Sequence, residues 1–201
     1  SSVNLKRNLR DETPRPLVIE FTGSPDSGKT TLINGIDSIF RNSGFRVNRP
    51  QEGAEVFRAL SLKTPLYNLT TGAYGLINVS SAATGRDYDV VLLDRALYDA
   101  DGWMLYWRDK DKLTEEEMRK FQKFFTHPIL LNYIDLCLCV VCAPEEAMRR
   151  AKLDAPTIVE SKEGDSTNLK SIGKLVEIFS KMHDKMKSAG KPVILIDSTH
   201  L

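Results

Sequence analysis

Eight consecutive residues, Gly23 to Thr30, have the pattern G-x-x-x-x-G-K-[S/T] of a phosphate-binding loop. In such a loop the backbone N–H groups turn inward around phosphates, and the helix that follows adds the positive end of its dipole. Lys29 can then reach the outer phosphates, and the Thr30 hydroxyl can hold Mg²⁺. We expect this stretch to bind a nucleoside triphosphate. The residues expected to hold it are Gly23, Ser24, Pro25, Asp26, Ser27, Gly28, Lys29, Thr30 and Thr31.

The residues on either side of the loop have the patterns that such a loop requires. Leu17 to Phe21 is an apolar run typical of a strand, and Thr31 to Phe40 has apolar residues at the spacing of a helix with one buried face. A glycine- and serine-rich turn could match the motif by chance. With strand, loop and helix in register, the phosphate-binding interpretation is favoured.

A second set of polar residues follows another apolar run. Tyr88 to Leu93 is expected to be a strand, and Asp94 at its end is the carboxylate expected to help Thr30 hold Mg²⁺. Arg95 comes next, where many motor ATPases have a carboxylate, and its guanidinium suits phosphate. The alternative is that Arg95 pairs with a surface carboxylate.

The remaining elements alternate between strand and helix, which predicts a parallel sheet covered on both faces. Further strands are expected at 45–48, 135–142 and 192–196, and helices at 54–62, 67–83, 98–107, 114–125 and 168–187. Another helix is expected to begin near Pro144, and 151–167 has no periodicity and predicts a mobile loop. We expect a polar N-terminal extension at 1–15 and one domain at 16–201.

Composition excludes several classes of protein. The chain has 28 Lys and Arg against 27 Asp and Glu, so the formal charge of +1 argues against nucleic acid or an anionic membrane as a partner. No apolar run is long enough to span a bilayer, and the opening 1–15 is polar, so a cytoplasmic location is expected. Cys137, Cys139 and Cys142 cannot converge on one metal from a strand, and we expect them to be reduced core residues.

The motifs together resemble the thymidylate kinase and deoxynucleoside kinase group of P-loop kinases. The resemblance runs from about Leu17 to Ser198 and includes the loop, the Asp94–Arg95 pair and the segment Asp135 to Arg150. It implies a P-loop NTPase fold, a three-layer α/β/α sandwich with five parallel strands in the order 2-3-1-4-5 and a mobile lid near 151–167. It also implies ATP as phosphate donor and allows a homodimer.

The resemblance assigns roles to several cations and to one carboxylate. Arg150 lies where the group has a phosphate-contacting arginine, with Arg149 as a neighbouring substitute, although both could be cations on a helix face. Glu52 lies near the glutamate that in deoxynucleoside kinases accepts the proton of the attacking hydroxyl. A solvated loop glutamate is the alternative.

Three further residues are candidates for binding the acceptor. Arg58 could clamp an acceptor phosphate, and Tyr98 or Trp103, which follow the Asp94–Arg95 pair, could stack on a flat ring. The alternatives are a surface arginine and core aromatics. The loop lacks the acidic third residue common in thymidylate kinases, because Pro25 stands there.

The sequence therefore predicts a Mg²⁺-dependent kinase that moves the γ-phosphate of ATP onto a small nucleoside-like or nucleoside-monophosphate-like acceptor. The chain contains no Asn-Lys-x-Asp element of regulatory GTPases and no Leu-Ser-Gly-Gly signature of transporter ATPases. Two rival hypotheses are a nucleotide-sensing module without useful turnover and a polynucleotide 5′-kinase. The near-neutral charge disfavours the latter.

Overall fold

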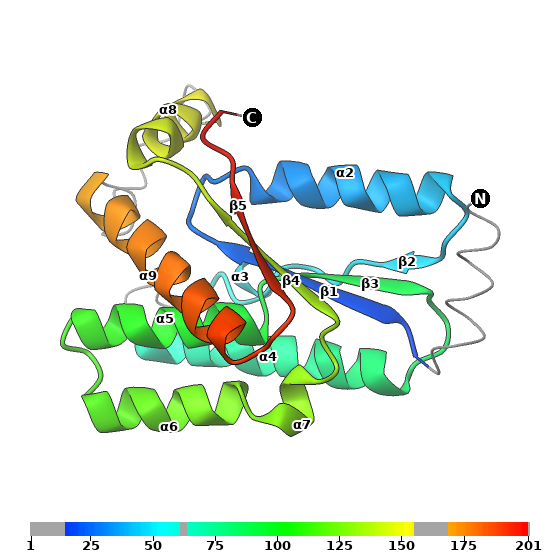
Figure 1. Cartoon of the computed structure of the whole chain (residues 1–201), viewed down its shortest axis with the longest axis horizontal. Helices are drawn as coiled ribbons and strands as arrows, with labels where there is room; N and C mark the ends of the chain where they lie inside the picture. The colour runs from blue at the N-terminus through cyan, green and yellow to red at the C-terminus, as the bar shows by residue number, and fades with distance from the viewer. Residues whose placement is uncertain (1–14, 61–63, 155–168, 201) are drawn as a thin grey trace.

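Five parallel strands form one sheet in the order β2-β3-β1-β4-β5, which confirms the predicted order (Figure 1). The computed structural model describes residues 15–60, 64–154 and 169–200. The strands are β1 (Leu17–Gly23), β2 (Val47–Asn48), β3 (Val90–Asp94), β4 (Leu136–Val141) and β5 (Val193–Asp197). The helices are α2 (Lys29–Asn42), α3 (Gly53–Val56), α4 (Pro65–Thr84), α5 (Leu97–Asp109), α6 (Glu115–Phe125), α7 (Pro128–Leu131), α8 (Pro144–Asp154) and α9 (Leu169–Ser188).

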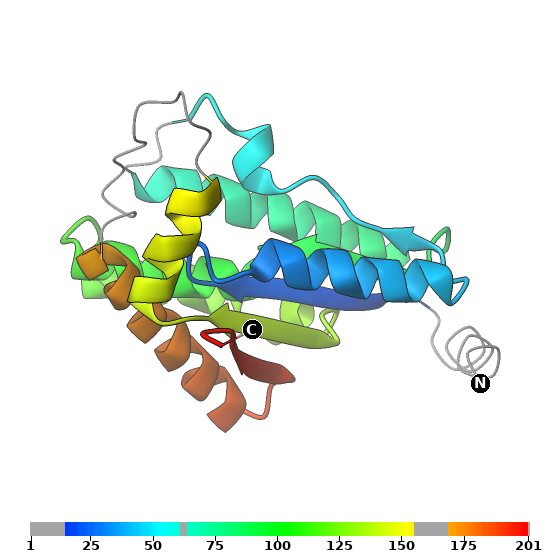
Figure 2. The same ribbon diagram turned by 90° about the horizontal axis from the view of Figure 1, so that it is seen from above.

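Helices cover both faces of the sheet, as a parallel sheet with buried central strands requires. Helix α2 lies on one face and crosses in front of β1 in Figure 2, whereas α4, α5 and α9 lie on the other. Alternate residues of β1 serve the two faces: Ile19 and Phe21 pack toward α2, and Val18 packs into the larger core under α4, α5 and α9. Glu20 is two residues beyond Val18, so its side chain lies on the same face of the sheet, the face covered by α5.

Two elements differ from the sequence-based expectation. The helix expected at 54–62 is only the single turn of α3, because Glu55, Val56 and Arg58 to Leu60 are exposed or nearly so and little packing sustains a longer helix. Helix α8 continues to Asp154 instead of ending at 150, stabilised by ion pairs from Glu146 to Arg149 and Arg150. The rest of the predicted lid, 155–167, lies outside the described residues, as does most of the predicted extension at 1–15.

Helix α4 rests directly on the turn between β3 and α5. A Cβ atom added to Gly75 would lie 2.7 Å from the Cα and 2.9 Å from the Cβ of Ala96, closer than real Cβ contacts. Glycine is therefore required at this position by close approach. The contact brings the backbone of α4 against the residues that follow Asp94 and Arg95.

Candidate active site

The loop between β1 and α2 curls around the carboxyl end of the sheet. Gly23 ends β1 with φ +136°, and a Cβ there would meet the carbonyl oxygen of Val140 at 1.8 Å, so both its conformation and its surroundings require glycine. The Ser24 N–H donates to that same carbonyl at 3.2 Å. Helix α2 begins at Lys29 with no acidic residue in its first turn, which leaves its positive dipole end facing the loop.

Two loop hydroxyls fit a phosphate ligand. The Oγ atoms of Ser24 and Ser27 are buried, in residues that are each 1% exposed, and neither has a hydrogen-bond partner among the described residues. Buried polar atoms are normally satisfied, so a pair without partners in this loop points to a polar ligand. The loop borders an open pocket of about 690 Å³ that also reaches Thr30, Thr31 and Arg95.

Lys29, which lines this pocket, forms a buried ion pair with Asp94. The Lys29 Nζ lies 2.7 Å from Asp94 Oδ1, and the two side chains are 9% and 7% exposed. Asp94 is thus held at the loop, where a phosphate-bound Mg²⁺ could use it. Since Mg²⁺ takes one or two protein oxygens besides phosphates, Asp94 and the exposed Thr30 hydroxyl fit a magnesium–nucleotide complex.

Arg95 lies between two carboxylates from different elements. Its Nε donates to Glu52 Oε1 at 3.1 Å, and its Nη1 donates to Asp99 Oδ1 at 2.8 Å. Burial alone would lower the pKa of Arg95, but the charges of Asp99, Glu52 and Asp94 outweigh it and raise the pKa. The backbone of Arg95 is left-handed, with φ +64°, an uncommon conformation for a residue other than glycine.

Three residues of this cluster were missed in the sequence. The Thr22 hydroxyl donates to Asp99 Oδ1 at 2.7 Å, so Asp99 joins the end of β1 to Arg95. Tyr67 of α4 is 8% exposed, and burial, then the charge of Glu52, raises its pKa, so its hydroxyl is protonated beside Glu52 and Arg95. Asp99 could have been found from its i+4 spacing to Arg95, whereas Tyr67 has no local signal.

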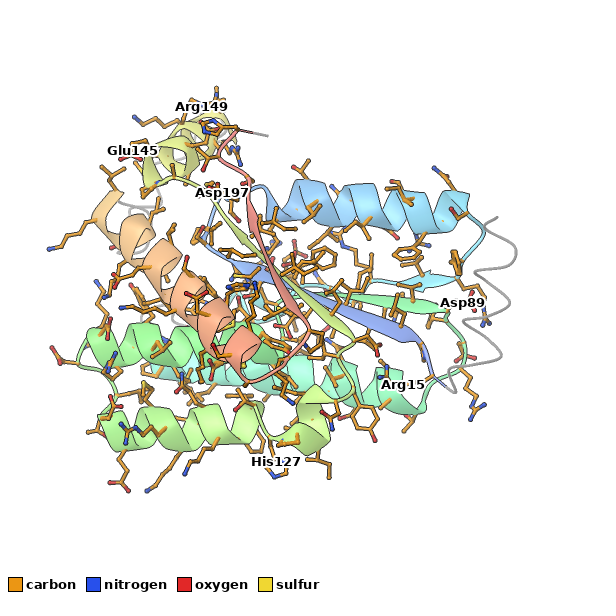
Figure 3. The ribbon with its side chains drawn as sticks, viewed as in Figure 1. Arg15, Asp89, His127, Glu145, Arg149 and Asp197 are labelled. Carbon is orange, nitrogen blue, oxygen red and sulfur yellow. The ribbon has the colours of Figure 1, made fainter. Side chains whose placement is uncertain are left out.

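The two arginines of α8 take different places. Arg150 donates from Nη2 to the Ser198 carbonyl at 2.7 Å and from Nη1 to the Ser198 Oγ at 3.2 Å, and its Nη1 lies 3.2 Å from a Cβ built on Gly28. Arg150 therefore lies beside the phosphate loop and lines the same pocket. The Arg149 side chain is 61% exposed and forks onto Glu146, on the outer side of α8 (Figure 3). Both arginines lower the pKa of Glu146 to about 2.

The structure corrects the aromatic candidates. Tyr98 is completely buried in the core, so it cannot contact an acceptor in the cleft. Trp103 is partly buried against Tyr106 and Phe179, with ring centroids 5.1 and 6.3 Å away, and it belongs to the packing between α5 and α9. Arg58 is exposed in the turn after α3. Position in the sequence after Arg95 does not determine which face of α5 a side chain occupies.

Comparison with known proteins gives a fold but no family. No family model and no curated protein matches the chain. Among solved structures, a deoxyadenosine kinase from M. mycoides with bound dATP is similar, with a TM-score of 0.61 and 15% identity over 90% of this chain and 91% of that one. This similarity confirms the predicted P-loop α/β fold. In the part of the chain that the structure describes, no helix is long and apolar enough to cross a membrane.

Proposed function

We propose that this protein is a kinase that transfers the γ-phosphate of ATP to a hydroxyl group of a small nucleoside-like acceptor. The observation that carries the proposal is the meeting of two groups at one end of the sheet. One is the phosphate loop with its Lys29–Asp94 pair, and the other is Glu52 held by Arg95. The name of the solved deoxyadenosine kinase supports an acceptor of this kind.

Charge around Arg95 favours a neutral acceptor over a phosphate. Its guanidinium already has Glu52 and Asp99 as partners, at 3.1 and 2.8 Å. An anionic acceptor would have to displace a carboxylate or lie beside one, which like-charge repulsion disfavours. A hydroxyl can instead donate its proton to Glu52, whose side chain is 26% exposed and therefore accessible.

The transfer can be written with these residues. Glu52 takes the hydroxyl proton as the acceptor oxygen bonds to the γ-phosphorus, and the bond from that phosphorus to the oxygen of the leaving diphosphate breaks. Lys29 leaves Asp94 for the phosphate oxygens, and Arg150 neutralises the charge that spreads over the transferred group. Arg95 donates to Glu52 and Asp99 through Nε and Nη1, so it can keep both carboxylates and turn its Nη2 donors to the transferred group. Mg²⁺ held by Asp94, Thr30 and the phosphates would supply further charge neutralisation.

The test is direct transfer from γ-labelled ATP and Mg²⁺ to a panel of nucleosides, nucleoside monophosphates and oligonucleotides. We expect label on a nucleoside and only background on the other two classes. Lys29→Ala is the control, since it removes the loop cation. Label on a monophosphate or an oligonucleotide, or ATP binding without transfer to any acceptor, would contradict the proposal.

A further inference from the structure

A carboxylate in the middle of the central strand caps a helix of the candidate site. Glu20 is 0% exposed, and its two oxygens accept four backbone hydrogen bonds. Oε1 accepts from the N–H groups of Ala96 and Asp99 at 3.0 and 2.9 Å, and Oε2 accepts from those of Leu97 and Tyr98 at 3.0 and 3.1 Å. These are the N–H groups at the start of α5.

Such N–H groups have no partner within their own helix and are usually satisfied by the N-cap side chain. The N-cap of α5 is Ala96, which has no side-chain hydrogen bond to offer. Glu20 supplies the missing acceptor from a different element. When ionised, it also places a negative charge at the positive end of the helix dipole.

The turn that Glu20 caps, between β3 and α5, contains Asp94 and Arg95 of the candidate site. Asp94 ends β3, and Arg95 has a left-handed backbone with φ +64° just before α5 begins. An unusual backbone of this kind persists where its surroundings hold it. The surroundings here are Glu20 within the sheet and Gly75 of α4 against Ala96.

Strand β1 holds this turn at two points on the same face. Glu20 holds the backbone, and Thr22, two residues later, donates to Asp99 Oδ1 at 2.7 Å. Asp99 then accepts from Arg95 at 2.8 Å. The position of the Arg95 guanidinium relative to the phosphate loop is thus set from β1, the strand that runs directly into the loop.

We propose that Glu20 is a positioning residue of phosphate transfer: by capping α5 from within β1, it fixes the turn that places Asp94 and Arg95 against the phosphate loop. The inference rests on the proposed kinase function. Burial of a carboxylate is costly, and an apolar residue would pack in a central strand at no such cost. A carboxylate at this position therefore indicates a requirement beyond core packing.

The test compares Glu20→Gln and Glu20→Asp with the parent protein. Gln keeps the size but replaces one acceptor oxygen with a donor that faces N–H groups, and Asp keeps the charge but is one methylene too short. We expect kcat to fall roughly ten- to hundredfold in Glu20→Gln, as for other supporting residues, and less in Glu20→Asp. The KM for ATP should stay within about threefold, because the loop itself is intact.

Two comparisons separate positioning from general destabilisation. Asp101→Asn is the matched control, since Asp101 is also a fully buried carboxylate on α5 but pairs with Lys185 at 2.8 Å. It should lower stability and leave the kcat of the folded protein unchanged. In an Arg95→Ala background the effect of Glu20→Gln on kcat should be smaller than in the parent protein, because one of the two groups that it positions is gone and only Asp94 remains.

The outcomes are distinguishable. A parent protein that transfers no phosphate contradicts the proposed function, and the Glu20 proposal is then decided by the Mg²⁺ dependence of ATP-analogue binding, which Glu20→Gln should weaken through Asp94. An active parent with unchanged kcat in Glu20→Gln overturns the Glu20 proposal. So does an equal loss with and without Arg95, or a failure of both Glu20 variants to fold, which would assign Glu20 to folding alone.

Discussion

The Nζ of Lys29 lies 2.7 Å from Oδ1 of Asp94, and both side chains are almost completely buried. The loop cation and the strand-terminal carboxylate therefore neutralise each other. Binding of a magnesium–triphosphate complex would give each a new partner, the phosphates for Lys29 and the metal for Asp94. The pair keeps both side chains within reach of the loop and avoids an uncompensated buried charge.

Lys29→Ala should reduce phosphate transfer by about a hundredfold or more, because it removes the mobile cation on the outer phosphates. It also leaves Asp94 buried without its partner, so we expect a lower melting temperature. Turnover from γ-labelled ATP and thermal unfolding measure the two effects. Exposed Lys181, in the middle of α9, is the control position, where alanine should change neither. Near-normal turnover by folded Lys29→Ala would remove this loop as the donor site.

Asp94→Asn should shift the Mg²⁺ dependence of activity more than the affinity for nucleotide, since the backbone cradle of the loop remains. The amide keeps one oxygen but no charge, so the midpoint of a Mg²⁺ titration should move to higher concentration. An unchanged midpoint and rate would show that Asp94 serves only to pair with Lys29.

Glu52→Gln tests the class of acceptor. A positioned base is worth about a hundred- to ten-thousandfold when the nucleophile is a hydroxyl, and Gln cannot take the proton. We expect a fall in kcat of that order with little change in ATP binding. A small effect together with transfer to a monophosphate would contradict the hydroxyl acceptor, because an anionic nucleophile needs no base.

Arg150→Ala and Arg149→Ala form a matched pair on adjacent residues of α8. Arg150 contacts Ser198 and borders the loop, whereas Arg149 is largely exposed and pairs with Glu146. We expect Arg150→Ala to raise the KM for ATP and lower kcat, each by roughly tenfold, and Arg149→Ala to change both by less than about twofold. Steady-state kinetics at fixed Mg²⁺ measure KM and kcat for both variants. Equal effects of the two variants would mean that α8 moves to bring Arg149 into the site.

Glu20 should make the free energy of unfolding depend on pH. Burial, opposed by its backbone hydrogen bonds, raises the pKa of Glu20 from 4.5 to about 7, with Asp99 and Tyr98 of α5 and Cys137 of β4 facing it. Between these values the native state binds more protons at Glu20 than the unfolded state, so this residue lowers the free energy of unfolding as the pH rises. Chemical denaturation of the parent protein and Glu20→Gln at several pH values measures this. Between about pH 4.5 and 7 the free energy of unfolding should fall with pH more steeply in the parent protein than in Glu20→Gln. Equal slopes in the two proteins over this range would contradict the prediction.

The sequence contains local information about the site and little about contacts between elements. The loop from Gly23 to Thr31 and the Asp94–Arg95 pair could be predicted because each is a short pattern at the end of a strand. The roles of Thr22 and Glu20 could not, because they depend on which face of β1 meets the start of α5. That pairing spans more than seventy residues of chain.

Two incorrect expectations have the same physical origin. Tyr98 is three residues beyond Arg95, and its burial follows from the rotation of α5 about its axis, which the first turn alone does not reveal. The helix expected at 54–62 has adequate propensity for its length, but few of its residues meet the core. Tertiary packing decided both cases.

Because Gly75 has no side chain, helix α4 packs directly on the turn that carries Arg95. Because the backbone of α4 touches Ala96 directly, α4 and the turn that carries Arg95 cannot slide past each other without losing that contact. Burial and then the nearby charge of Glu52 raise the pKa of Tyr67, which lies on the first turn of the same helix. Helix α4 therefore ties the surroundings of Glu52 to the turn that carries Arg95, and a larger residue at position 75 would push the two apart.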